Sequence, residues 1–294
     1  MRIRPAISII SALLLAAPAL AVDAKSATHV SSYTWREKAI WFGGFSALEL
    51  SEDGQSMTVL SDRANILTAT ITRDGDRITD VAAGKAYSVR SSRNRILLGW
   101  AGDSEGLAMA PDGTIFISFE GVHRVARYPK LGSPAKVLPR PKAFEGLARN
   151  GSFEGLAMDG RGRLYTLTES SRTIDGQIPV YMWNGQGWST PFTLPPSDGF
   201  LPVSADFGPD GRFYVLERDA SLLGFRSRLR RWEVTEGGVR AEETLFRTGT
   251  GTHDNLEGLS VWRDDQGRLR ATMISDDNFL GLQRTELVEY LLPE

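Results

Sequence analysis

Glutamate recurs along this chain in one short phrase. Glu-Gly-Leu begins at Glu105, Glu154 and Glu257, and related segments that begin at Ser46 and Ser204 carry serine in the same place. A phrase that returns about every fifty residues indicates one structural unit copied along the chain. Each copy is therefore expected to present its acidic or serine side chain at the same point of the fold.

A second series of acidic residues follows the first. Glu120 follows Glu105 at the same distance at which Glu169 follows Glu154, so both series belong to the same repeated unit. The second series comprises Asp62, Glu120, Glu169, Glu217, Asp276 and Asp277. The basic residues that accompany it are Arg63, Arg218 and, further along its own copy, Arg284.

Carboxylates brought together by such a repeat would repel one another, by roughly 4 kcal/mol per close pair at an effective dielectric near 20. A hard cation such as calcium, arginine partners or raised pKa values would relieve that repulsion. We expect a polar, functional group of acids. The alternative is that each acid caps a turn or pairs with an arginine of its own copy.

The fifth copy departs most from the plain repeat. His253-Asp254-Asn255 precedes Glu257, and Asp276-Asp277-Asn278 follows the next apolar run. Oxygen-rich clusters of this kind suit calcium or a site that polarises water. Aspartate and asparagine also favour turns for purely conformational reasons, which is the competing interpretation.

The elements that carry these residues are short strands joined by tight turns. In the second copy, apolar or β-branched runs cover residues 104–110, 114–119 and 123–128, and residues 135–138 supply a fourth. No stretch of ten residues has helical periodicity, which excludes a helical solenoid. Four strands in about fifty residues is the size of one propeller blade. The chain is therefore predicted to be an all-β protein, a β-propeller.

Five copies predict five blades, with a sixth left open. The last copy lacks an outer strand after residues 287–291, and residues 28–36 precede the first copy and could close the ring there. The second position of each phrase is small (Ala47, Gly106, Gly155, Ala205 and Gly258). Small residues suit an innermost strand, where blades converge on the axis.

A propeller also predicts where the acids meet. Within a blade the inner strand leaves one face and the second strand returns to it. The beginnings of inner strands and the ends of second strands therefore surround one mouth of the central channel, and both acidic series are expected there.

Composition narrows the class of protein further. Residues 1–21 have a basic start, an apolar centre and an Ala-Leu-Ala end, which predicts a cleaved signal peptide before a single domain of residues 22–294. With 34 basic and 36 acidic residues, the chain lacks the excess of basic residues that nucleic-acid binding requires. The absence of cysteine excludes disulfides and thiolate metal sites. We expect an exported protein, periplasmic or secreted, without membrane contact after cleavage.

Two familiar catalytic patterns are set aside. Residues 102–106 match G-x-S-x-G around Ser104, but a nucleophile elbow needs a strand, a turn and a helix, whereas this segment enters a strand. His29, His123 and His253 are the three histidines, and the first lies far from the others in sequence. A histidine-rich zinc site is therefore not expected.

Several motifs together resemble the phytase-like family, also described as having esterase-like activity of phytase. They are Glu105-Gly106-Leu107-Ala108, Asp198-Gly199-Phe200-Leu201-Pro202, Leu216-Glu217-Arg218, Asn255-Leu256-Glu257-Gly258-Leu259 and Ser275-Asp276-Asp277-Asn278-Phe279. The resemblance runs from about Phe42 to Leu291. It implies an exported bacterial propeller and hydrolysis of phosphate or other esters. The likeness to calcium-dependent propeller phytases is one of architecture.

Two functions follow as hypotheses. In the first, a metal-assisted esterase, most plausibly a phosphomonoesterase, the catalytic residues are Glu105, Glu154 and Glu257. Calcium would be held by Glu105, Glu154, Glu257, Asp276 and Asp277, and would supply the attacking water. The anionic or ester substrate would be clamped by Arg63, Arg218 and Arg284. In the second, a non-catalytic propeller uses the mouth to bind a small polar ligand or a protein partner.

Overall fold

The computed structural model describes residues 26–147, 151–196 and 198–294, so the predicted signal segment lies outside the described residues. Strands dominate, and the two helical segments are single 3₁₀ turns, η1 (Gly99–Gly102) and η2 (Lys142–Phe144). The described residues contain no helix long and apolar enough to cross a membrane.

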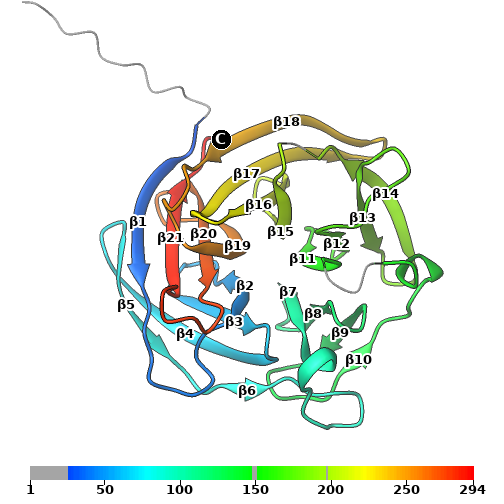
Figure 1. Ribbon diagram of the computed structural model, residues 1–294, viewed down its shortest axis with the longest axis horizontal. Coiled ribbons are helices and arrows are strands. Elements are labelled where there is room, and N and C mark those ends of the chain that lie inside the picture. The colour runs from blue at the N-terminus through cyan, green and yellow to red at the C-terminus, as the bar shows by residue number, and fades with distance from the viewer. Residues whose placement is uncertain (1–25, 148–150, 197) are drawn as a thin grey trace, which may run out of the picture.

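Five antiparallel sheets are arranged in a ring around a central axis (Figure 1), which confirms the predicted five-bladed β-propeller. The described part of the chain has no sixth sheet. Blade 1 consists of β2 (Phe45–Leu50), β3 (Ser56–Ser61), β4 (Asn65–Asp74) and β5 (Arg77–Ala83), with β6 (Tyr87–Ser88) paired to β4. Blade 2 consists of β7 (Ser104–Met109), β8 (Ile115–Phe119), β9 (Arg124–Tyr128) and β10 (Lys136–Val137).

The other three blades repeat this order from the axis outward. Blade 3 consists of β11 (Phe153–Met158), β12 (Leu164–Thr168), β13 (Ile178–Trp183) and β14 (Trp188–Leu194). Blade 4 consists of β15 (Leu201–Phe207), β16 (Phe213–Ser221), β17 (Gly224–Thr235) and β18 (Gly238–Arg247). Blade 5 consists of β19 (Asn255–Arg263), β20 (Leu269–Asp276), β21 (Glu286–Leu291) and β1 (Thr28–Thr34).

The N-terminal chain closes the ring as predicted. β1 pairs antiparallel with β21, and in Figure 1 the two lie side by side as the first and last colours of the chain. The next residue, Trp35, is 1 % exposed and stacks on Phe45 with ring centroids 5.3 Å apart. This contact ties the closing strand of blade 5 to the inner strand of blade 1.

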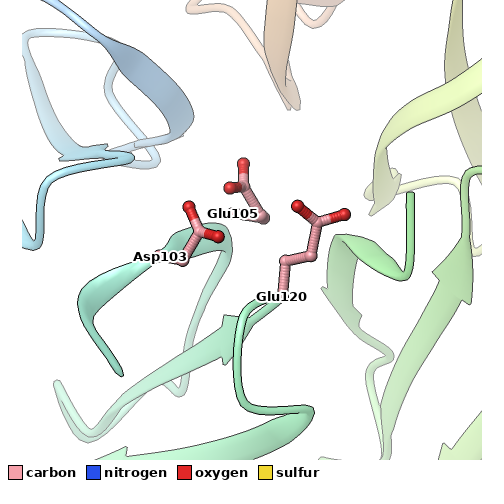
Figure 2. A group of neighbouring side chains, drawn as sticks. All are labelled: Asp103, Glu105 and Glu120. Carbon is pink, nitrogen blue, oxygen red and sulfur yellow. The ribbon is translucent and has the colours of Figure 1, made fainter. Parts of the chain in front are cut away.

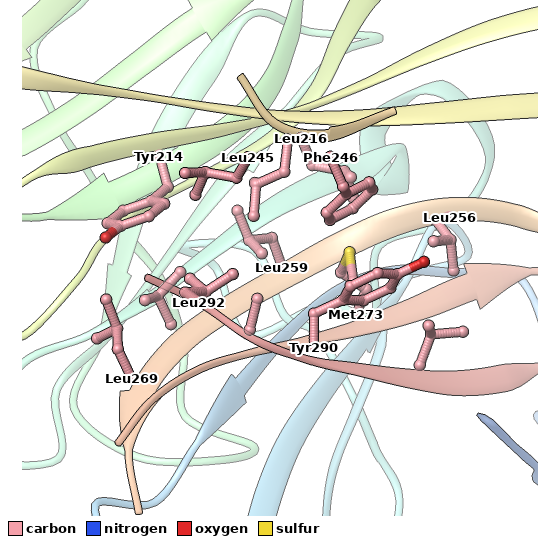
Figure 3. Packing of buried hydrophobic residues seen from close by; sticks show 14 of the residues in the cluster. Tyr214, Leu216, Leu245, Phe246, Leu256, Leu259, Leu269, Met273, Tyr290 and Leu292 are labelled. Atoms are coloured by element: carbon pink, nitrogen blue, oxygen red, sulfur yellow. The ribbon is translucent and has the colours of Figure 1, made fainter. Parts of the chain in front are cut away.

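The core lies mainly between neighbouring blades. Figure 3 shows the cluster in which Leu216 and Leu245 of blade 4 pack with Leu259 and Met273 of blade 5. A second cluster joins blades 5 and 1 around Trp35. Because each blade covers its apolar face with the next blade, the ring must be complete for every face to be buried.

Backbones crowd at the axis where the sequence has glycine. A Cβ atom on Gly155 would lie 2.7 Å from the backbone nitrogen of Ala205 in the next blade. A Cβ on Gly106 would lie equally close to the nitrogen of Leu156. These distances confirm that the small second position of the phrase serves packing between inner strands.

Candidate functional site

A β-bulge in the inner strand positions each glutamate of the Glu-Gly-Leu phrase. The pairing of β11 with β12 skips Glu154, and the pairing of β19 with β20 skips Glu257. In blade 2 the extra residue falls within Glu105-Gly106. A bulge turns the side chain of the extra residue away from the pleat alternation. The three carboxylates thereby reach one mouth of the channel, where Glu154 and Glu257 raise the pKa of Glu105 and Glu257 raises that of Glu154.

Blade 4 differs from the alignment expected from sequence. In β15 the bulge skips Val203, so an apolar residue and not Ser204 occupies the position of the glutamates. Asp206 then lies deeper, on the same level as Glu49 of blade 1, and the two carboxyls interact. Burial raises the pKa of Asp206 to about 7. The segment that begins at Ser204 is thus shifted by one residue relative to the Glu-Gly-Leu segments. The sequence could not show this shift, because no local residue pattern marks the position of the bulge.

Asp103, Glu105 and Glu120 form a compact group of carboxylates in blade 2 (Figure 2), with one oxygen of each within 4.8 Å of the others. All three side chains are partly buried. Glu120 also accepts a hydrogen bond of 2.9 Å from the backbone N–H of Ser152 in the following connection. Three converging carboxylates can bind a metal ion. Glu120 was expected here from its place in the second series, whereas Asp103, which precedes the repeated phrase, was not.

Arg218 neutralises the acids on the other side of the mouth. Its guanidinium pairs with Glu257 and lies 3.1 Å from Oε1 of Glu169. The same group donates a hydrogen bond of 2.7 Å to Asn255, which in turn donates one to Glu257. Blade 4 therefore brings a cation to the mouth where the other blades bring acids.

Burial and mutual repulsion raise the pKa of the remaining mouth carboxyls. Burial, followed by neighbouring carboxylates, moves the pKa of Glu105 and of Glu154 well above the ordinary value. The same causes raise the pKa of Asp62 to about 6 and that of Asp276 to about 8. Without a bound cation, Asp276 therefore holds a proton at neutral pH.

Asp277 is engaged in holding its own loop. Its carboxylate accepts hydrogen bonds of 3.0 Å from the N–H of Gly44, 3.1 Å from that of Phe279 and 3.2 Å from the hydroxyl of Thr285. Gly44 has a φ of +64°, and a Cβ there would lie 2.4 Å from the Asp62 carboxylate. This glycine lets the loop of blade 5 approach the entrance of blade 1.

The three predicted substrate arginines differ in freedom. Arg63 is exposed, lies over the ring of Phe279, and forms no ion pair with a described residue. Arg284 pairs with Glu286 at 2.9 Å and lies 3.7 Å from Asp254. The guanidinium of Arg218 is shared between Glu169 and Glu257. Of the three arginines, Arg63 alone forms no ion pair with a described residue and can bind an incoming anion.

Glu217, expected at the mouth, lies inside blade 4. It is fully buried and accepts from Arg228 at 2.7 Å and from Arg230 at 2.9 Å. Arg228 stands opposite Glu217 on β17, and Arg230 lies two residues further along the same strand, opposite Val215, so this contact depends on strand register. His253 likewise turns inward and lies 2.8 Å from the hydroxyl of Tyr290, so it does not join the acids.

A large cavity of the described residues lies away from the acidic mouth. A cavity of about 930 Å³ is lined by Met109, Met158 and Phe207 at the far ends of three inner strands. The acidic mouth is thus an open, polar entrance, and its chemistry depends on carboxylates at the surface of the channel.

Solved structures resemble this chain at low identity. The catalytic domain of a GH62 α-L-arabinofuranosidase from Coprinopsis cinerea superposes with a TM-score of 0.54 at 12 % identity, covering 91 % of this chain and 97 % of that one. A gluconolactonase from Xanthomonas campestris has a TM-score of 0.43 at 15 % identity, covering 80 % and 68 %. A virginiamycin B lyase from Staphylococcus aureus has a TM-score of 0.40 at 14 % identity, covering 90 % and 75 %.

At 12 % identity, the superposition on the arabinofuranosidase shows a shared fold alone. No curated protein matches the sequence. The family described as "Phytase-like: Esterase-like activity of phytase" matches residues 40–279, most of the blades and nearly all of the mouth. With its five blades and this match, the chain belongs to the phytase-like family.

Proposed function

We propose that this protein is an exported, periplasmic or secreted hydrolase of ester bonds, foremost of phosphomonoesters, that works with calcium at the acidic mouth. The observation that carries the proposal is the group Asp103, Glu105 and Glu120, whose oxygens lie within 4.8 Å of one another. Membership of the phytase-like family supports the reaction class.

The donor set suits a hard divalent cation. Calcium prefers carboxylate oxygens and tolerates irregular geometry, whereas zinc prefers nitrogen or sulfur ligands. The raised pKa of Glu105 reflects burial beside other carboxylates, a cost that a cation would remove. Asp62 adds a buried Oδ1 that has no hydrogen-bond partner among the described residues. The residues present therefore fit calcium.

Glu105 belongs both to this group and to the calcium ligands expected from sequence. Glu154, Glu257 and Asp276 lie at the same mouth and would complete the ligand set or compensate its charge. Asp277 would act through its loop, because its carboxylate already has three donors. When bound, calcium would polarise the ester and lower the pKa of water beside it.

The side chains of this chain would handle the substrate and the proton. Arg63, free of ion pairs with described residues, would bind the anionic part of the substrate. Arg218 would orient Glu257, and Arg284 would hold the neighbouring loop. Burial and Glu169 raise the pKa of Glu154, which favours its protonated form, and Glu154 would donate that proton to the leaving oxygen. Water would supply the hydroxyl and return the proton to Glu154.

Hydrolysis of p-nitrophenyl phosphate, phytate and simple carboxylic esters, each with calcium and with EDTA, tests the proposal. We expect calcium-dependent turnover that Glu105→Gln reduces by about a hundredfold or more. Glu236→Gln, which removes an exposed acid on the opposite face, is the matched control. Absence of turnover of every ester, together with no metal bound by the pure protein, would refute the hydrolase.

A second function is favoured by the partners that some acids already have. Glu257 and Glu169 share Arg218, and Glu120 accepts backbone N–H groups. Acids satisfied in this way suit a non-catalytic mouth that recognises a small polar ligand or a protein. A melting temperature unaffected by calcium and EDTA, combined with a defined captured ligand, would favour this second function.

A further inference from the structure

The exposed apolar side chains of the molecule gather on the mouth face. Among the described residues, every large hydrophobic side chain that is exposed lies in a connection on that face, except Val137 on β10. These connections are the ones that lead into inner strands and those that join second to third strands. The turns of the opposite face carry no such residue among the described ones.

Six of these residues define what we call the apolar rim, and together they represent every blade. They are Ile40 before blade 1, Leu98 before blade 2, Ile174 in blade 3, Leu222 and Leu223 in blade 4, and Leu282 in blade 5. Leu98 is 75 % exposed and Leu223 87 %, and the other four are fully exposed. Apolar side chains exposed singly are ordinary on protein surfaces, so the feature to explain is their restriction to one face of the propeller.

The form of the rim favours a fluid apolar layer over a protein partner. Protein interfaces concentrate their apolar contacts in a central packed patch. Here the tips stand around an acidic centre, one or two per blade. Trp100, 55 % exposed beside Leu98, adds an amphipathic ring of the kind enriched where membrane meets water.

The charge around the rim complements anionic headgroups. Each tip has a basic residue within a few positions in sequence: Lys38, Arg95, Arg172, Arg226 and Arg284. Arg226 pairs with Asp219, and Arg284 with Glu286. The exposed acids of the described mouth-face connections are Glu37, Glu145, Asp175 and Asp198. The exposed lysines and arginines of the same connections outnumber them. The mouth acids themselves are recessed and partly buried.

We propose that the mouth face docks on an anionic lipid surface, with the apolar rim inserted below the headgroups and the flanking basic residues among them. Such docking combines buried apolar area with electrostatic attraction. It departs from the expectation of no membrane contact drawn from the sequence. Although it concerns the same mouth face, its test is independent of the proposed hydrolysis, since vesicle binding is measured without substrate.

Co-sedimentation with sucrose-loaded vesicles tests the proposal. We expect the purified protein to bind vesicles of equal parts phosphatidylglycerol and phosphatidylethanolamine, to bind phosphatidylcholine vesicles far less, and to dissociate as salt is raised. Replacing the rim residues Leu222, Leu223 and Leu282, together with the neighbouring Leu280, which is 59 % exposed, by serine should lower the partition coefficient at least about tenfold. Val137→Ser is the control, because it removes an exposed apolar group of the outer strand of blade 2 that is not part of the rim.

Three outcomes would overturn the proposal. The first is no binding to vesicles rich in phosphatidylglycerol. The second is a four-leucine variant that binds as the wild type does. The third is a wild-type protein that self-associates in solution while the variant is monomeric, which would make the rim an interface between copies. The replaced side chains are exposed, and a thermal melt of the variant verifies that it folds. Vesicle binding is read without substrate, so its failure says nothing against hydrolysis.

Discussion

At the scale of single residues, the mouth is a balance between repulsion and compensation. Glu105 and Glu154 are partly buried beside other carboxylates, which raises the pKa of both. Arg218 offsets part of this charge, but it is already shared between Glu169 and Glu257. A divalent cation would neutralise the carboxylate charge that remains in blade 2.

Glu105→Gln should therefore separate the destabilisation that the buried carboxylate causes without metal from its contribution to calcium binding. In EDTA at pH 8 the variant should melt at a higher temperature than the wild type, because a neutral amide removes repulsion and the burial of a charge. In calcium the order should reverse, since the variant loses a ligand. Calorimetry in both buffers measures this. An equal response of wild type and variant to calcium would contradict a role for Glu105 in binding.

The raised pKa values also predict how stability changes with pH. Asp276 has a pKa of about 8 in the folded protein against 3.8 as its ordinary value. The folded state therefore binds the proton more tightly, and this stabilisation is complete below about pH 4 and is lost as pH rises through 8. Asp62, with a pKa of about 6, adds to the loss between pH 4 and 6.

In the absence of metal, the free energy of unfolding should consequently fall between pH 5 and 8, and Asp276→Asn should flatten the decline above pH 6. Asparagine retains the oxygen that accepts the N–H of Asn278. Denaturant unfolding across this pH range measures the effect. A variant with the same slope as the wild type would show that another group causes the decline.

At the scale of elements, the bulge of each inner strand connects packing to function. It directs Glu154 toward the channel and leaves Gly155 against the backbone of Ala205 in the next blade. Glu154 and Gly155 therefore act together. Gly155 permits the close approach of the blades, and the bulge turns Glu154 toward the channel.

Gly155→Ala should destabilise the protein by about 1–3 kcal/mol, because the new methyl group overlaps the neighbouring backbone and cannot move aside. Gly160→Ala is the control, since a Cβ there meets no atom within 4 Å and the site has no left-handed φ. Urea denaturation compares the two. Equal stability of both variants would mean that the blades can separate without cost.

At the scale of the whole molecule, stability depends on closing the ring. β1 comes from the beginning of the described chain and completes blade 5, while Trp35 continues into the core between blades 5 and 1. Residues far apart in sequence therefore have to meet before blades 5 and 1 are fully covered, so we expect cooperative unfolding of the closed ring.

Trp35→Ala should cost about 3–5 kcal/mol, the range for removing a fully buried aromatic side chain. Ile40→Ala, five residues later in the same connection, should have little effect because Ile40 is fully exposed. Thermal unfolding followed by circular dichroism and by tryptophan fluorescence measures both. A single transition shifted in the first variant alone is expected, and separate transitions would contradict closure by this segment.

The sequence by itself determined the architecture. The recurring phrase, the glycine turns and the missing outer strand predicted a five-bladed ring with N-terminal closure, because turn chemistry and strand patterning are local properties repeated in every copy. It also indicated that Glu105, Glu154 and Glu257 share one position.

Only the tertiary structure decided which side chains meet. The bulge in β15 placed Val203 at the position expected for Ser204, and strand register buried Glu217 beneath two arginines. Asp103 joined the acids from a connection outside the repeat. These outcomes depend on pairing across strands and on contacts between blades, which a residue's neighbours in sequence do not specify.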